Sequence, residues 1–420
     1  MREVNNFVAN MPEMKSGNEL IEAMSVLPEY DSSIRNANQA IRLMTLSDIY
    51  RLYLPSSMSI DIYTKLYLAL FRSIQKKGTQ LAIEQRNENN RAIQQLQYRG
   101  IIGGSDSFTI IGTSGIGKSS AIMRAIDLIT ENRVIEVEKP YTKIIPCLIV
   151  QCPFDSSVKG LLLEILRKVD EVLQSDYYQK AIKSRTVTID VLIGSVSTIA
   201  LNHMGILVID EIQNVANSKN GKNLVGMLTQ LINNSGISIC MVGTPESSVF
   251  FESAMQLARR SVGLQYTTMN YDDYFENFCK VLWKYQYVKN KTEISPSIME
   301  WLFEHSAGVV SVVVSLIHDA QEIAILSGVE VLNIETLNQA YQQRLSLLHE
   351  YIQPNITHGE QTSRKKNITV TRKKTAASIK DNQVIEKKSS LKELVEQAKS
   401  NNLDIVSLMK DNYTVVEVAV

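Results

Sequence analysis

The sequence predicts an α/β fold in which a five-stranded, mainly parallel sheet carries helices on both faces. Two observations predict it. Between about residues 101 and 270, short apolar runs alternate with windows of helical periodicity, an order typical of parallel sheets. The apolar runs are also continuous rather than alternating, as in Ile206-Leu-Val-Ile209, which is expected of strands buried on both faces.

The elements of this region follow from the same patterns. The five predicted strands are Phe108–Ile111, Ile144–Gln151, Gly205–Ile209, Ile237–Val242 and Gly263–Met269. The helical windows between them are Ser119–Glu131, Val158–Gln174, Leu224–Asn233 and Ser247–Arg260.

A glycine-bearing turn joins the first strand to the first helix. It fits the pattern G-x-x-x-x-G-K-[ST], in which backbone N–H groups surround phosphates and the helix adds its positive end. Lys118 would place a cation on the phosphates and Ser119 would offer a hydroxyl to Mg²⁺. The residues predicted to bind the nucleotide are Gly112, Thr113, Ser114, Gly115, Ile116, Gly117, Lys118, Ser119 and Ser120.

Two carboxylates end the third strand, at Asp210 and Glu211. This position, about ninety residues after the phosphate loop with one strand between, is where a nucleotide-hydrolysing fold needs them. We expect Asp210 to hold Mg²⁺ through water and Glu211 to act as the base that activates the attacking water.

The fourth strand ends in Gly243-Thr-Pro-Glu246, and its tip is predicted to lie between the two preceding motifs. Thr244 would there touch the γ-phosphate or the attacking water. The other interpretation is a turn in which Thr244 or Pro245 only shapes the start of the next helix.

The regions on either side of the α/β domain have other sequence patterns. Residues 1–100 read as a helical region whose tyrosines, such as Tyr50 and Tyr53, are expected to pack against the next domain rather than bind a ligand. The α/β domain spans 101–270, and four helical windows predict a small helical domain over 271–352. Residues 353–390 have few large apolar side chains and two basic clusters, which predicts a disordered tether. Residues 391–420 are either a partner-docking tail or disordered.

The amino-acid composition limits which partners and which cell compartment are expected. The formal net charge is +0, so any contact with nucleic acid must come from a local patch. The 4 cysteines form no CxxC pair and no metal-type cluster, which favours buried free thiols and a reducing cytosol. The first ten residues lack the apolar core of a signal peptide. No continuous run approaches the roughly 18 apolar residues that span a bilayer, so no membrane partner is expected.

These motifs, in this order, resemble the AAA+ P-loop ATPases, and more narrowly the TnsC/TniB-type regulators of DNA transposition. The stretches that carry the narrower resemblance are Leu27-Pro-Glu-Tyr30 with Arg35, Gly112–Ser119, Leu207-Val-Ile-Asp-Glu-Ile-Gln213, Val242-Gly-Thr-Pro-Glu246 and Ala258-Arg-Arg260. The resemblance covers roughly residues 25–350 and makes the helical domain a lid.

The resemblance implies a bacterial, cytoplasmic ATPase that binds ATP and Mg²⁺ and assembles as rings or filaments on duplex DNA, without sequence specificity. It would link a target selector, either a protein or an RNA-guided complex, to transposase subunits, possibly through the C-terminal tail. Hydrolysis would dismantle the assembly. Either Arg259 or Arg260 would complete the neighbouring subunit's site as an arginine finger, unless they are only cations at a helix end.

DNA contacts are implied for two basic groups on the inner surface of such an assembly, whose phosphate contacts would be salt-sensitive. These residues are Lys180, Lys183, Arg185, Lys219 and Lys222. The family's common lid arginine is missing from Val309–Leu326, which puts a lid contact to the γ-phosphate in doubt.

Two alternatives stay open at this point. A replication helicase loader or initiator-like AAA+ ATPase would share the core but bring a helicase-binding or winged-helix module, and the helices after residue 270 show no clear recognition helix. A nucleotide-gated signalling scaffold would act through binding alone. Glu211 argues against it, because a binding-only switch needs no water-activating carboxylate.

Overall fold

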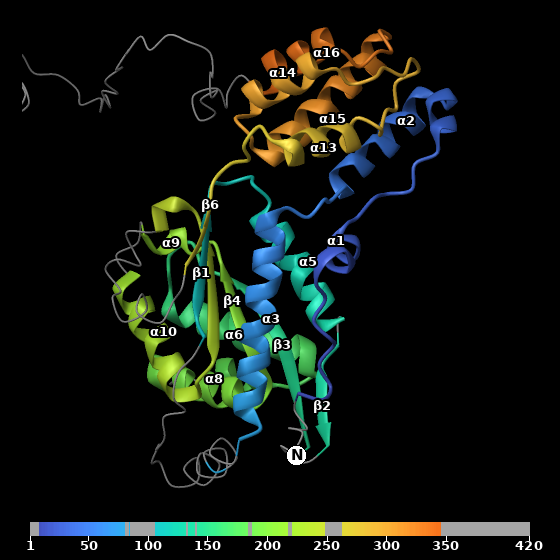
Figure 1. Ribbon diagram of the computed structural model, residues 1–420. Helices are drawn as coiled ribbons and strands as arrows, with labels where there is room; N and C mark the ends of the chain where they lie inside the picture. Colours follow the sequence, from blue (N-terminus) through green and yellow to red (C-terminus); the bar gives the residue numbers. More distant parts are fainter. Residues whose placement is uncertain are drawn as a thin grey trace, which may run out of the picture. The chain divides into compact units, whose positions relative to one another are not determined.

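The computed structural model in Figure 1 describes residues 8–79, 84, 106–131, 133–138, 141–183, 187–216, 221–247 and 263–345. They belong to one compact unit that spans Met1–Thr357, and residues His358–Val420 form a second unit. The predicted tether and tail lie outside the described residues, as do most of residues 80–105 of the predicted helical N-terminal region and its junction with the α/β domain.

The sheet has six strands in the order β2-β3-β4-β5-β1-β6. The five predicted strands are confirmed as β1 (Phe108–Gly112), β3 (Tyr141–Gln151), β4 (Met204–Asp210), β5 (Ser238–Gly243) and β6 (Leu264–Tyr266). All neighbouring pairs among these five are parallel. The prediction missed β2 (Ile135–Glu138), which pairs antiparallel with β3 at the sheet edge.

Helices cover both faces of the sheet (Figure 1). On one face α3 (Ser57–Lys77) and α5 (Lys118–Thr130) share a core with Phe108, Ile110 and Val208. On the other face, α6 (Val158–Leu173), α8 (Ile189–His203) and α10 (Gly221–Ser235) pack against residues such as Leu207 and Ile209. Successive strand residues therefore enter two different cores, which explains the continuous apolar runs.

An insertion of two helices between β3 and β4 was not predicted. The short α7 (Tyr177–Lys183) is held by Asp170, whose carboxylate accepts hydrogen bonds from the backbone N–H groups of Tyr177 at 2.9 Å and Tyr178 at 2.8 Å. In α8, Thr188 is the N-cap and accepts from the N–H of Val191. A side-chain cap of this kind satisfies a donor that the first turn leaves free.

The lid domain consists of α13 (Asp273–Leu282), α14 (Pro296–Ser306), α15 (Val310–Ser327) and α16 (Ile334–Ala340), with a short continuation at Tyr341–Leu345. All four predicted windows contain a helix. Ser295 caps α14 with Pro296 in its first turn, and Asn333 forms a capping box with Thr336 at the start of α16.

One of these helices, α15, is long and apolar enough to cross a membrane by length and composition alone. Because α15 contains polar residues such as His318 and Asp319, it is not a continuous apolar run of the roughly 18 residues that span a bilayer. Half of it is buried inside the structure, where Val313, Leu316 and Ile317 belong to the lid core. This burial is the behaviour of a core helix.

The N-terminal helices divide between two cores. Residues of α1 (Gly17–Met24), such as Leu20 and Met24, pack with α3 and α5. Leu46 and Ile49, from α2 (Gln39–Leu46) and the following 3-10 turn η2 (Ser47–Arg51), instead join the lid core. Mutual backbone hydrogen bonds between Val26 and Tyr53, at 2.8 and 2.9 Å, join the two chain segments where they cross.

A buried ion pair fastens α2 to the lid. The Arg42 guanidinium is 2% exposed and donates to both carboxylate oxygens of Glu330 at 2.6 Å, while Glu330 is 13% exposed. Arg42 also donates to the carbonyl oxygen of Tyr287 at 3.0 Å. Bidentate pairing of this kind adds geometric specificity to charge attraction. The pair joins residues that are 288 positions apart in the sequence.

All four cysteines are free thiols. Cys152, Cys240 and Cys279 are buried, and Cys147 is half-buried. Burial raises the pKa of the Cys147, Cys152 and Cys279 thiols to about 12. These groups therefore stay protonated at neutral pH and act as small apolar side chains.

We expect Arg42→Ala to lower the free energy of unfolding by about 3 kcal/mol at neutral pH, because it leaves a largely buried Glu330 carboxylate without its cation. Urea titration measures the change. The control Arg51→Ala removes an exposed guanidinium that pairs with Asp48 and should cost less than about 1 kcal/mol. Equal losses of unfolding free energy in the two variants would show that the buried ion pair stabilises the fold no more than an exposed one.

The same pair gives a pH dependence. The hydrogen bond from Arg42 holds the pKa of the Glu330 carboxyl below its ordinary value of 4.5. The stabilisation from Glu330 is therefore complete above pH 4.5 and is lost as the pH falls through the lower pKa of the folded state. The difference in unfolding free energy between the unmodified protein and Arg42→Ala should shrink over that acidic range.

Candidate nucleotide-binding site

The phosphate loop lies where the sequence predicts it, between the end of β1 and the start of α5. Gly115 has φ +81° and Gly117 has φ +95°, backbone conformations that glycine adopts without the penalty of a side chain. Gly117 is the N-cap of α5 and offers no side-chain cap. The free N–H groups and the positive end of this helix therefore face the loop.

Lys118 lies inside the loop. Its ammonium group donates to the carbonyl oxygens of Gly112 at 2.6 Å and Thr113 at 2.9 Å. Burial lowers the pKa of Lys118, and the nearby Asp210, Glu211 and Glu246 act in the opposite direction. A cation surrounded by backbone carbonyls and carboxylates is suited to a ligand that carries several negative charges.

Ser119 and Asp210 meet across the loop. The Ser119 hydroxyl donates to Asp210 Oδ2 at 3.1 Å, although the two residues are 91 positions apart. A hydroxyl and a carboxylate are oxygen donors of the kind that Mg²⁺ prefers. The two residues predicted to hold Mg²⁺ are thus adjacent, and their chemistry fits that ion.

Glu211 follows in a strained backbone conformation with φ +59°, which is uncommon for a residue with a side chain and typical of functional sites. Its N–H donates to Asp210 Oδ1 at 2.8 Å. Its carboxylate accepts a hydrogen bond from the amide of Gln213. The role of Glu211 as a base stays a prediction, and its place beside Asp210 is suited to it.

β5 lies between β1 and β4 in the sheet, so its tip lies between the two motifs as predicted. Thr244, at this tip, lines the cavity. A hydrogen bond from the Thr244 side chain lowers the pKa of the Glu246 carboxyl. The Thr244 carbonyl also accepts from the N–H of Ser247 at 3.0 Å in a short 3-10 turn. Both sequence interpretations of Thr244 fit this geometry.

These residues surround a polar cavity of about 270 Å³. Its lining includes Lys118, Ser119, Asp210, Glu211 and Thr244, and it also includes Gln213, Gly243 and Ser311. The structure therefore brings together the phosphate loop, the two carboxylates and the tip of β5. Gln213 and Ser311 were not predicted to belong to the site.

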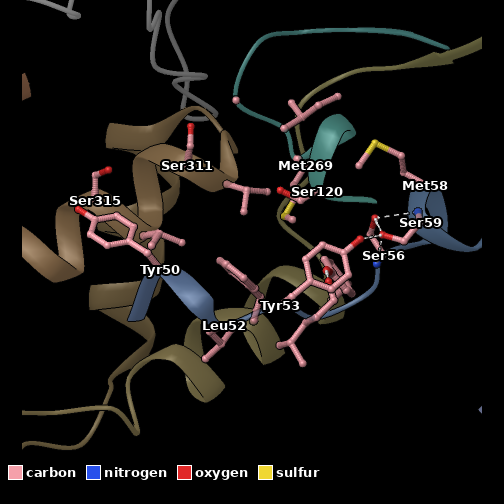
Figure 2. Close-up of a pocket in the computed structure, with 18 residues that line it drawn as sticks. Tyr50, Leu52, Tyr53, Ser56, Met58, Ser59, Ser120, Met269, Ser311 and Ser315 are labelled. Atoms are coloured by element: carbon pink, nitrogen blue, oxygen red, sulfur yellow. Dashed lines mark hydrogen bonds between the residues drawn. The ribbon is translucent and has the colours of Figure 1, made fainter. Parts of the chain in front are cut away.

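A second cavity, of about 230 Å³, adjoins the other side of the phosphate loop (Figure 2). Its walls are Leu52, Tyr53 and Met58 from the N-terminal region, Met269 and Phe278 from the start of the lid, and Val310 and Val314 of α15. Gly115, Gly117 and Ser120 line both cavities. A mainly apolar pocket next to a phosphate site is suited to the base and sugar of a nucleotide.

The N-terminal tyrosines pack as expected and also line this cavity. Tyr50 and Tyr53 do pack, Tyr50 against the His318 ring at 4.6 Å and Tyr53 through its hydroxyl to Ser59 at 2.7 Å. The expectation that they bind no ligand stays a prediction, but their packing leaves both at the wall of the cavity. No local pattern could have shown this, because the walls come from four separate stretches of the chain.

The lid touches the phosphate loop directly. The N–H of Ser311, in the first turn of α15, donates to the carbonyl oxygen of Gly115 at 3.1 Å. A Cβ atom at Gly115 would lie 2.4 Å from Ser311 Oγ. The helix carries no arginine, as the sequence shows, and Arg344 of the lid pairs instead with Asp319 and Glu322. Ser311 is therefore the lid's polar contact to the loop in the described part of the chain.

The predicted DNA and finger residues are only partly visible. Lys180 and Lys183 lie on α7 and are exposed, and Lys180 forms an ion pair with Asp176 at 2.7 Å. Lys222 lies in α10, but its side chain is not described. Arg185, Lys219, Arg259 and Arg260 lie outside the described residues. Their roles stay predictions.

The fold and the site define an AAA+ P-loop ATPase: a parallel sheet, a phosphate loop opening α5, two carboxylates at the end of β4 and a helical lid. Within this class, residues 91–268 match the family model described as bacterial TniB protein. The match agrees with the resemblance to the TnsC/TniB-type regulators over that part of the chain.

Other comparisons give the following. No curated protein matches the chain. Among solved structures, the chain is similar to Drosophila ORC bound to DNA, with 12% identity over 80% of this chain and 70% of that one and a TM-score of 0.46. It is also similar to the Aeropyrum pernix ORC1 protein in complex with DNA, with 16% identity over 62% of this chain and 64% of that one and a TM-score of 0.39.

We expect Gly115→Ala to weaken binding of a non-hydrolysable ATP analogue at least about tenfold, because it adds backbone strain and a clash with Ser311. Gly117→Ala tests strain alone, since a Cβ there meets nothing within 4 Å, and should cost less. The control Gly226→Ala in α10 meets nothing and has no positive φ. Fluorescence titration measures all three, and unchanged affinity in Gly115→Ala would contradict the lid contact.

Proposed function

We propose that this protein is an ATP-dependent regulator of DNA transposition. It binds ATP with Mg²⁺, assembles as rings or helical filaments on duplex DNA, and couples a target selector to the transposase. Hydrolysis of ATP to ADP and phosphate times its disassembly. The observation that carries the proposal is the shared cavity that Lys118, Ser119, Asp210 and Glu211 line, in a chain whose residues 91–268 match the TniB model.

The two adjoining cavities suit the two ends of ATP. The triphosphate would lie against the α5 N-terminus and Lys118, and the adenosine would lie between Tyr53, Met269 and Val310. Bound Mg²⁺ would neutralise charge on the phosphates. Ser119 and Asp210 are the residues that would hold it.

The chain's own groups then act on the attacking water. The Glu211 carboxylate accepts its proton, and Lys118 stabilises the negative charge that develops on the transferred phosphoryl group. Thr244 is positioned at the same cavity to contact the γ-phosphate or the water. An arginine of the neighbouring subunit, Arg259 or Arg260, completes the site, which makes hydrolysis depend on assembly.

DNA contact is proposed for Lys180 and Lys183, which are exposed on α7, and for Arg185, Lys219 and Lys222. Contacts of these side chains with backbone phosphates would be independent of sequence and would weaken with salt. The C-terminal tail is proposed to dock transposase subunits, and the protein is proposed to act in the bacterial cytoplasm. The selector is either a protein or an RNA-guided complex.

Negative-stain imaging of the pure protein with duplex DNA and a non-hydrolysable ATP analogue tests the assembly. Rings or filaments on DNA are expected, and they should be absent without nucleotide. Monomers under both conditions would instead favour a nucleotide-gated scaffold.

Two substitutions separate binding from hydrolysis. Lys118→Ala should abolish ATP binding and DNA assembly together, because it removes the cation that faces the phosphates. Glu211→Gln should retain both but lower ATP turnover at least about 100-fold and leave the DNA-bound assembly intact over time. Turnover is measured by phosphate release and assembly by DNA co-sedimentation. Normal turnover in Glu211→Gln would show that another group is the base.

The arginine finger is tested by mixing subunits. Arg259→Ala and Arg260→Ala, made separately, should include one variant that loses ATP turnover. Mixing that variant with Glu211→Gln, which still binds ATP and assembles, should restore part of the turnover, because Glu211→Gln supplies the arginine and the arginine variant supplies an intact Glu211. If mixing restores nothing for either arginine, the site is not shared in this way.

A further inference from the structure

Gln213 is an unassigned polar residue in the catalytic cavity. It begins the short helix α9 (Gln213–Ala216), two residues after Glu211, and lines the same cavity as Lys118 and Asp210. Its Nε2 donates a hydrogen bond to Glu211 Oε2. Because an ionised carboxylate can only accept, this contact fixes which way the Gln213 amide faces.

The other end of the amide has no partner. Gln213 Oε1 is buried and accepts no hydrogen bond in the described part of the chain. A buried acceptor without a donor is costly, and rotating the amide to change its surroundings would break the contact with Glu211. The side chain therefore keeps its hydrogen bond to Glu211 at the cost of leaving its own amide oxygen without a donor.

The backbone around Glu211 is fixed more firmly than its side chain. The N–H of Ile212 donates to the carbonyl oxygen of Val242 at 2.9 Å, which ties the turn to β5. The N–H of Asn214 donates to the carbonyl oxygen of Glu211 at 3.1 Å. The Glu211 side chain itself is exposed, and its rotatable bonds allow several rotamers. In the described part of the chain, the hydrogen bond from Gln213 is the side-chain contact that favours one of these rotamers.

The tip of β5 leaves room for this contact. A Cβ atom at Gly243 would lie 3.2 Å from Gln213 Oε1 and 2.7 Å from Ile212 Cγ2. A larger residue at Gly243 would therefore push against the side chain that holds Glu211. Glycine at position 243 is thus favoured because a side chain there would collide with Ile212 and Gln213, and not only because of the geometry of the turn.

We propose that Gln213 is a positioning residue for water activation. Its amide holds one oxygen of the Glu211 carboxylate, so that the other oxygen faces the cavity and is free to accept the proton of the attacking water. This inference rests on the proposed ATPase function. It assigns Gln213 to the chemical step and not to nucleotide binding.

The test compares Gln213→Met, which keeps the length of the side chain and removes the donor, with the unmodified protein. We expect kcat for ATP to fall about 10-fold to 100-fold, since a small misplacement of a catalytic group has this effect. KM for ATP and the Kd of a non-hydrolysable analogue should stay within about twofold, since phosphate contacts are unchanged. Gln213→Glu, which replaces the donor by an acceptor, should lose at least as much kcat.

A double-mutant cycle tests whether Gln213 affects kcat through Glu211. In a Glu211→Ala background, measured by single turnover, adding Gln213→Met should change the residual rate less than about twofold, because Gln213 acts only through Glu211. The control Gln230→Met, at an exposed position of α10, should match the unmodified protein in kcat and melting temperature.

Three results would overturn the inference: an unchanged kcat in both Gln213 variants, a raised kcat, which would make Gln213 a brake, or a full additive loss in the Glu211→Ala background. Each requires that the unmodified protein turns over ATP. Absence of turnover in the unmodified protein would instead contradict the proposed function itself, so the two failures are distinguishable.

Discussion

The parallel pairing of β5 with both β1 and β4 is the constraint on which the candidate site depends. Parallel strands end at the same edge of a sheet, so the phosphate loop, Thr244 and the two carboxylates emerge side by side. The spacing set by these strands lets the Ser119 hydroxyl reach Asp210 at 3.1 Å. The lid then closes the same edge through Ser311.

The parts of the site that could be predicted from the sequence are those whose signal is local. The phosphate loop needs glycine at backbone conformations such as φ +81° and +95°, and a helix must begin directly after it. Asp210 and Glu211 end a strand that is buried along nearly its whole length. These requirements fix residue types over a few neighbouring positions, so the motifs can be recognised from the sequence alone.

The parts that could not be predicted leave no clear signal in a local stretch of sequence. β2 is a strand of 4 residues at the sheet edge, too short for a clear pattern. The cavity beside the loop is built from residues near 53, 116, 269 and 310, which no window spans together. Gln213 contacts the Glu211 carboxylate next to a residue with φ +59°, a backbone conformation that residue types alone do not reveal.

The division of the N-terminal helices between two cores has a consequence for how the chain folds as it is synthesised. The α/β core needs residues up to about Tyr266, because β1 pairs with β5 and β6. By contrast, α2 finds its ion-pair partner only when Glu330 has been made, 288 residues later. Leu46, Ile49 and Leu52 stay without their lid neighbours until then. We therefore expect the lid to form after the α/β core during synthesis, together with the cavity that it completes.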